Sequence, residues 1–158
     1  RLLGLGCAGV AAAGAGVALV ARGDEMGGAV AEDGSRLVAV RADDAACIKT
    51  APIGVAANVV SMQEMDPDVI SGYFDILRQN QAPTTSFYCC NKRYKRLKDG
   101  TEVRFEEYPW RGSDQILLDA VCRWSQWIYS KQPPFWQYRR GASRVIWHRL
   151  AKLVRHPT

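Results

Sequence analysis

Residues 2–21 read LLGLGCAGVAAAGAGVALVA, an uncharged run that is bracketed by Arg1 and Arg22. A helix of this length would be about 30 Å long, which matches the hydrocarbon thickness of a bilayer. We therefore expect a single transmembrane anchor at residues 1–22. Small residues would let a neighbouring membrane helix approach this anchor closely. These residues are Gly4, Gly6, Gly9, Gly14 and Gly16.

The same run has other interpretations. It could be the apolar part of a targeting peptide, or a tail rich in glycine and alanine. Its first glycines also fit the G-x-G-x-x-G pattern of dinucleotide-binding proteins, and residues 17–28 look like the second strand and loop of a flavin-binding unit. However, only three residues precede the first glycine, which is too few for the first strand of such a unit. A nucleotide site is therefore not expected.

Charge is distributed unevenly along the chain. Residues 1–84 carry six basic and ten acidic residues, whereas residues 85–158 carry fifteen basic and six acidic residues and all five tryptophans. The overall composition, 47% hydrophobic and 23% charged, is that of a globular protein and argues against wholesale disorder or a disulfide scaffold. The two halves are therefore expected to face different surroundings.

A linker and a helix are predicted after the anchor. Residues 23–65 are expected to be irregular, or extended along a partner, with one short strand at residues 36–41. Asp66 is a good N-cap and Pro67 suits the first helical position. Apolar residues then recur at helical spacing, and the helix should end near Gln79.

A β-hairpin is predicted at residues 86–108. Asp99-Gly100 is a dipeptide typical of a two-residue type I′ turn, and strand-like runs flank it on both sides. Counting outward from this turn pairs Tyr94 with Phe105, which places two aromatic rings on one face of the hairpin.

Two C-terminal helices complete the predicted domain. Apolar residues between positions 113 and 131, among them Trp124 and Trp127, form a stripe at helical spacing. The hairpin is expected to pack its Tyr94/Phe105 side on this stripe. A last helix is predicted over residues 142–155. The expected fold is therefore a small α+β protein, with a transmembrane helix, an irregular linker, and a domain at residues 66–158 made of a helix, a β-hairpin and two helices.

The sequence contains no recognisable catalytic or metal-binding motif. The five cysteines have no repeating spacing, and neither CxxC nor HxxxH is present. We therefore predict no enzymatic activity, no cofactor and no metal site. The cysteines are expected to be free thiols or, in an oxidising space, to include a disulfide from Cys47 to Cys89 or Cys122.

The basic, aromatic C-terminal part is the predicted interface. Trp, Tyr and Arg are enriched at protein interfaces, and aromatic rings with cations also suit lipid headgroups. On the last helix, cations and apolar side chains are expected on different sides, which favours a headgroup boundary or a protein groove over RNA. The predicted interface residues here are Trp136, Tyr138, Arg139, Arg140, Arg144, Trp147, Lys152 and Arg155.

Anchor and interface together predict a non-catalytic accessory subunit of a large organellar membrane complex. An electron-transport or ATP-synthesising chain of the mitochondrial inner membrane is the favoured setting, with other subunits and membrane lipid as partners. An RNA-associated organellar ribosomal protein is the alternative. A subunit of a photosynthetic complex in the thylakoid membrane is a further alternative.

Overall fold

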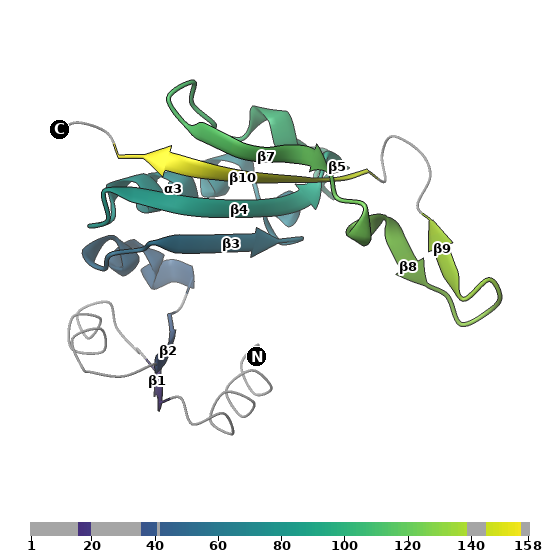
Figure 1. The fold of residues 1–158 in the computed structure, drawn as a ribbon, viewed down its shortest axis with the longest axis horizontal. Coiled ribbons are helices and arrows are strands. Elements are labelled where there is room, and N and C mark those ends of the chain that lie inside the picture. Colours follow the sequence, from purple (N-terminus) through teal and green to yellow (C-terminus); the bar gives the residue numbers. More distant parts are fainter. Residues whose placement is uncertain (1–15, 20–35, 41, 139–144, 156–158) are drawn as a thin grey trace. The chain divides into compact units, whose positions relative to one another are not determined.

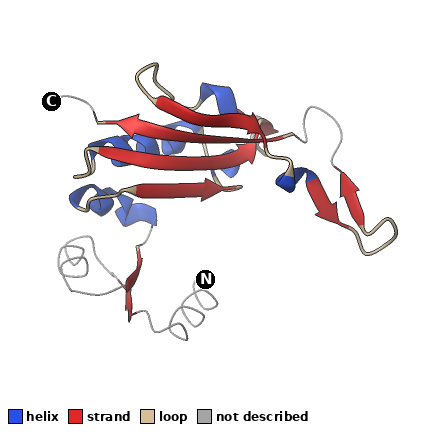
Figure 2. Cartoon of the chain, viewed as in Figure 1, coloured by secondary structure: helices blue, strands red, loops and turns tan. Residues whose placement is uncertain are grey.

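The chain divides into two compact units, Arg1–Pro52 and Ile53–Thr158, and each is considered by itself. The structure is a computed structural model that describes residues 16–19, 36–40, 42–138 and 145–155 (Figure 1). Strands predominate over helices in these residues (Figure 2). The predicted fold, in which helices predominate, is therefore wrong.

The first unit contains a pair of short parallel strands, β1 (Gly16–Leu19) and β2 (Arg36–Ala39), followed by the 3₁₀ helix η2 (Ala42–Thr50). The short strand predicted at residues 36–41 is confirmed by β2. The predicted membrane helix is not confirmed, because its described part, β1, is a strand, and its other residues lie outside the described ranges. Among the residues that the structure describes, no helix is long and apolar enough to cross a membrane.

The second unit is built on a four-stranded sheet with the order β3-β4-β10-β7 (Figure 1). β4 runs parallel to β3 and antiparallel to β10, and β10 is also antiparallel to β7. The four strands are β3 (Val55–Val59), β4 (Thr84–Lys92), β7 (Gln115–Val121) and β10 (Ile146–Val154). Segments that are far apart in the sequence therefore meet in one sheet.

The predicted helix is confirmed as α3 (Pro67–Gln79). Asp66 occupies the N-cap position with an extended backbone, and Pro67 takes the first helical position. The short 3₁₀ helix η3 (Met62–Glu64) precedes α3 and follows β3. Ile70 and Phe74 of α3 are buried in the main core.

The β-hairpin forms between β5 (Tyr94–Arg96) and β6 (Glu102–Arg104), but its register differs from the prediction by one residue, so that Tyr94 lies opposite Arg104. The reason lies in the turn. Leu97 N–H donates to the carbonyl of Thr101, and Gly100 alone of the turn residues has a positive φ, of 96°. This is a three-residue loop with glycine in the left-handed position, whereas a type I′ turn needs two such residues.

The shift in register separates the two aromatic rings that were predicted to share a face. Phe105 begins the 3₁₀ helix η4 (Phe105–Glu107) and is fully buried in the core. Tyr94 lies outside that core, and its hydroxyl donates to Glu102. The predicted packing of a Tyr94/Phe105 face on a helical stripe is therefore wrong.

The two predicted C-terminal helices are also strands. The segment predicted as the first helix forms β7, the 3₁₀ helix η5 (Trp124–Gln126) and β8 (Trp127–Tyr129). Residues 146–154 form β10, which is hydrogen-bonded along both edges by β4 and β7. From Ala151 onward, buried and exposed residues alternate, which is the period of a strand. Pairing with distant strands therefore decides the structure against the helical spacing in the sequence.

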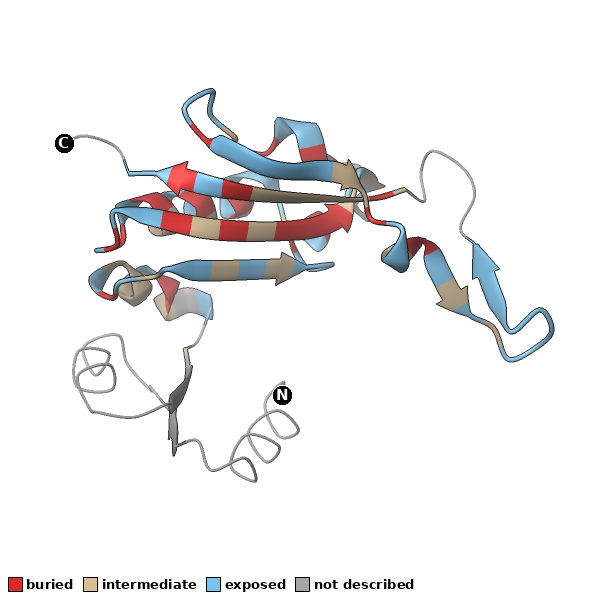
Figure 3. Cartoon of the chain, in the orientation of Figure 1, coloured by how far each residue is buried: buried red, intermediate tan, exposed pale blue. Residues whose placement is uncertain are grey.

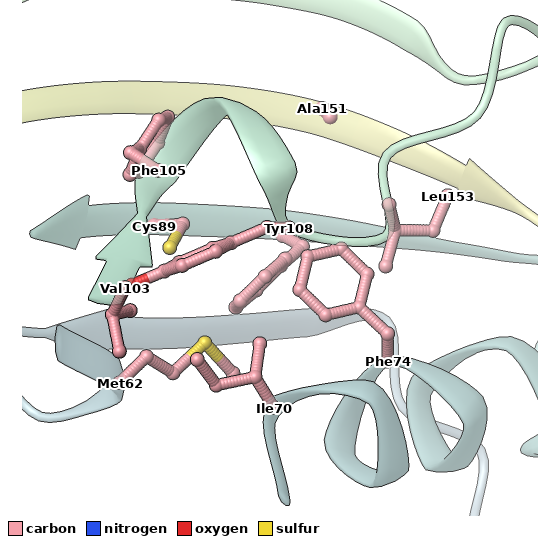
Figure 4. Packing of buried hydrophobic residues seen from close by; sticks show 10 residues of the cluster. Met62, Ile70, Phe74, Cys89, Val103, Phe105, Tyr108, Ala151 and Leu153 are labelled. Atoms are coloured by element: carbon pink, nitrogen blue, oxygen red, sulfur yellow. The ribbon is translucent and has the colours of Figure 1, made fainter. Parts of the chain in front are cut away.

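The main core lies on one face of the sheet, between β4 and β10 on one side and α3, β6 and η4 on the other (Figures 3 and 4). Phe74 contacts Phe87 edge to face with 5.3 Å between ring centroids, and Trp110 lies 4.8 Å from Phe74. Residues on the opposite face of the sheet include Tyr88 and His148, whose side chains contact each other. One face of the sheet therefore packs in the main core, and the opposite face carries the Tyr88–His148 pair.

Candidate functional site

An aromatic hairpin in the second unit is the strongest candidate for a functional surface. Its strands, β8 and β9 (Trp136–Tyr138), form a separate two-stranded sheet beyond the end of the main sheet (Figure 1). Trp127 lies opposite Tyr138, and Tyr129 lies opposite Trp136. Because side chains alternate between the faces of a strand, these four rings share one face. We call it the aromatic face.

The rings of the aromatic face contact one another across the strands. Trp127 and Tyr138 meet edge to face with 5.2 Å between centroids, and Tyr129 and Trp136 do so at 5.6 Å. Phe135, in the connecting loop, stacks near Tyr129 at 6.4 Å. Such cross-strand aromatic pairs hold a hairpin together, but two strands of three residues are marginal in water by themselves.

The aromatic face is open to solvent (Figure 3). Tyr129 is 64% exposed and Trp136 is 60% exposed, and no ring of the aromatic face belongs to a core cluster of the described residues. Trp124, in η5, is 87% exposed. The prediction that Trp124 and Trp127 lie on a buried helical stripe is therefore wrong. A contiguous set of exposed aromatic rings is typical of a surface that contacts a ligand, a membrane or another protein.

Indole rings line a pocket at the aromatic face. It measures about 310 Å³ and is lined by Trp124, Trp127 and Trp136. A lining made of indole rings is suited to apolar groups and to the methyl groups of a quaternary ammonium.

The charged residues in and near the hairpin sequence are all basic. Residues 120–158 contain eight basic residues and no acidic residue. Arg123 precedes η5, and Lys131 lies in the loop between β8 and β9. Neither forms an ion pair with another residue that the structure describes. An anionic surface would therefore attract this part of the chain.

The structure brings together only some of the residues predicted for the interface. Trp136 and Tyr138 share the aromatic face. Trp147 and Lys152 lie on β10 at positions of opposite parity and therefore on opposite faces of the sheet, and Arg155 is exposed just after β10. The indole N–H of Trp147 donates to the Asp119 carboxylate, so this ring is engaged within the domain.

Most of the remaining residues predicted for the interface have no described position. Gly4, Gly6, Gly9, Gly14, Arg139, Arg140 and Arg144 lie outside the described residues, and Gly16 is the first residue of β1. The prediction of a last helix with cations on one side and apolar residues on another is wrong. Residues 146–154 form a strand, in which successive side chains point to opposite faces of the sheet.

Sequence reasoning missed part of the aromatic face. Trp127 and Tyr129 were assigned to a helix, although Trp-Ile-Tyr and Trp-Gln-Tyr on either side of Pro133-Pro134 alternate in the manner of two strands. That alternation, with the prolines between the two runs, was the available signal for a hairpin.

Other chemistry in the described residues is sparse. They contain no group of three side chains that could hold a metal ion, and Cys47, Cys89, Cys90 and Cys122 are free thiols. Comparisons with protein-family models, with curated proteins and with solved structures found no match.

Proposed function

We propose that this protein is a non-catalytic accessory subunit of a membrane complex, and that its aromatic hairpin attaches it to an anionic lipid surface. The exposed aromatic face, in a segment without carboxylates, is the observation that carries this proposal. Trp and Tyr rings are favoured at the lipid–water boundary, where the ring meets the acyl region and the N–H or O–H group stays in water.

The arrangement of charge also supports lipid over single-stranded nucleic acid. A surface that reads bases presents cations among its aromatic rings, so that bases stack where phosphates are held. Among the residues that the structure describes, the aromatic face carries rings alone, whereas Arg123 and Lys131 lie before the first strand and in the connecting loop. Cations beside an inserted apolar face suit anionic headgroups above an acyl layer.

The test is flotation of the full chain with vesicles of phosphatidylcholine and with vesicles that also contain an anionic lipid. We expect binding to the anionic vesicles that weakens as salt is added, together with a blue shift of tryptophan fluorescence. Full burial of one large apolar side chain is worth about 1.5–3 kcal/mol. If each indole gains half of that, the double variant W127S/W136S should bind roughly tenfold to a hundredfold more weakly.

The matched control is Val55→Ser. Val55 is an exposed apolar residue on β3, outside the hairpin, and its replacement should leave vesicle binding unchanged. Equal binding by W127S/W136S and the wild type would contradict the proposal. So would failure of the wild type to bind vesicles together with retention on single-stranded RNA that nuclease abolishes, which would place the protein with nucleic acid instead.

A further inference from the structure

A second pocket, which shares Trp124 with the indole pocket and is also lined by Arg123, is lined by two cysteines. It measures about 480 Å³ and lies at the end of β4 and β7, on the face of the sheet opposite the main core. Its lining includes Tyr88, Cys90, Cys122, Ser125 and His148. The Tyr88 hydroxyl and His148 Nδ1 are 3.1 Å apart, so the pocket has a polar wall as well as a wall with sulfur atoms.

One hydroxyl group lies between the two sulfur atoms. Ser125 Oγ is 3.1 Å from Cys122 Sγ and 3.8 Å from Cys90 Sγ. Both cysteines belong to a small buried cluster with Ile146, whose carbonyl accepts the backbone N–H of Cys122 at 2.9 Å. The fold therefore brings together two thiols that are 32 positions apart in the sequence.

The two thiols differ in acidity. Burial opposes the ionisation of Cys122, but the Ser125 hydroxyl, the backbone N–H groups of Ser125 and Trp124, and the Cys90 thiol outweigh it and lower the pKa of Cys122. Burial raises the pKa of Cys90, and the neighbouring Cys122 adds to this effect. Cys122 is therefore the more acidic of the two thiols. The thiolate is the nucleophilic form of cysteine.

Cys89, in the same unit, is a fully buried thiol that we expect to be unreactive. It precedes Cys90 in β4 and therefore points to the opposite face, where it lies in the main core with no exposed surface. Burial raises the pKa of Cys89 to about 12. Two adjacent cysteines thus have different surroundings, and only Cys90 reaches the pocket.

We propose that this pocket is an oxidation site, in which Cys122 reacts with a small hydroperoxide and Cys90 then closes a disulfide with it. The Cys122 thiolate attacks one peroxide oxygen, the O–O bond breaks, and the leaving oxygen takes up a proton as water or an alcohol. Cys122 is thereby oxidised to a sulfenic acid, and the peroxide is reduced. The sulfur of Cys90 then attacks the Cys122 sulfur, the S–O bond breaks, and water leaves with the proton of the Cys90 thiol.

The strand arrangement allows the second step through a local movement. β10 lies between β4, which carries Cys90, and β7, which ends at Val121, one residue before Cys122. A disulfide requires Cβ atoms about 3.5–4.5 Å apart. Because Cys122 follows the last residue of β7, a shift of Cys122 toward β4 would break its backbone hydrogen bond to Ile146 but would leave the pairing of β7 with β10 in place.

The test uses the full chain, hydrogen peroxide and mass spectrometry of each cysteine. In the wild type we expect a Cys90–Cys122 disulfide, and in C90S a Cys122 sulfenic acid that dimedone traps. Loss of the Ser125 hydrogen bond should slow oxidation of S125A about threefold to tenfold. The variants C89S and S130A are the controls, and both should react as the wild type does.

A second measurement needs no variant. In the reduced wild-type chain, iodoacetamide should label Cys122 before Cys89 and Cys90. Labelling or oxidation of Cys89 as fast as that of Cys122 would overturn the proposal. So would peroxide treatment that leaves all thiols of the wild type reduced, or C90S giving the same disulfide yield as the wild type. None of these readouts depends on lipid binding, so the oxidation site and the proposed function can fail separately.

Discussion

Replacing Arg78 by methionine is expected to destabilise the second unit severely, because it leaves a buried carboxylate without its partner. The guanidinium of Arg78 on α3 donates two parallel hydrogen bonds to Asp114, from Nη1 to Oδ1 and from Nη2 to Oδ2, both at 2.7 Å. Nη2 also donates to the carbonyl of Pro109 at 3.0 Å. The pair therefore joins α3 to the segment that leads into β7.

The expected loss in the free energy of unfolding follows from the burial of both side chains. The side chains of Arg78 and Asp114 are 2% and 0% exposed, so water cannot take the place of a missing partner. Removing one member of a buried pair costs about 3–5 kcal/mol. That is a large part of the roughly 5–15 kcal/mol that stabilises a typical domain. The matched control is Lys95→Met, which breaks a pair with the half-exposed Glu64 and should cost about 0–1 kcal/mol.

The effect of Arg78→Met should also depend on pH with a defined sign. Burial opposes the ionisation of Asp114, but the Arg78 guanidinium and the Arg111 backbone N–H outweigh it and hold the pKa of Asp114 below its ordinary value of 3.8. A lowered pKa contributes stability that is present above pH 3.8 and is lost as the pH falls through the folded-state pKa. Without Arg78, burial dominates and the pKa should rise, so the deficit of the variant should grow as the pH increases.

The assay is urea unfolding of wild type, R78M, K95M and the double variant R78M/D114L at pH 7 and near pH 4. We expect R78M to lose the most at pH 7, and R78M/D114L to recover much of the loss, because no unpaired charge remains. If R78M loses no more than K95M at pH 7, the inference that Asp114 is buried and charged is refuted. A deficit that is equal at both pH values would refute the titration argument alone.

Three other perturbations test the fold. Phe74→Ala removes a fully buried ring that contacts Phe87 and Trp110, and it should cost about 3–5 kcal/mol in the free energy of unfolding. Gly100→Ala places a side chain at a φ of 96° and should cost about 1–2 kcal/mol, measured by thermal melting, whereas Lys98→Ala, at an exposed position of the same loop without a positive φ, should cost less. Deleting residues 127–138 should change the free energy of unfolding by no more than about 0.5 kcal/mol, because no ring of the aromatic face packs in a core cluster of the described residues.

Local signals in the sequence predicted α3 well and the β-hairpin in part. Asp66 and Pro67 mark the start of α3 locally, because Asp66 takes the N-cap position, although without a side-chain hydrogen bond, and the fixed φ of Pro67 suits the first helical position. Asp99-Gly100 identified a hairpin but not its register. The same dipeptide fits a two-residue loop and a three-residue loop with glycine in the left-handed position, and the choice between them shifts every pair by one residue.

The C-terminal strands could not be predicted from local spacing. Ile146, Leu150 and Leu153 fit one side of a helix, yet β10 is held by hydrogen bonds to β4, which lies more than fifty positions earlier in the chain. Short apolar runs suit a helix or a buried strand equally, and only the distant partner decides. The assignment of Trp124 and Trp127 to a buried stripe followed from that error, whereas Trp136 and Tyr138 were selected by residue type alone.

The length of one connection links the fold to the proposed function. β7 and β10 are antiparallel neighbours, and such strands can be joined by a loop of about two to five residues. Here residues 122–145 intervene, and they carry six large aromatic side chains that are at least 44% exposed. A sheet gains little stability from rings that remain in water. A hairpin that pairs with no further strand makes few contacts to offset the conformational entropy lost when it is ordered. The lipid attachment proposed above would bury these rings, because the indole rings and the flanking cations match the chemistry of a lipid headgroup layer.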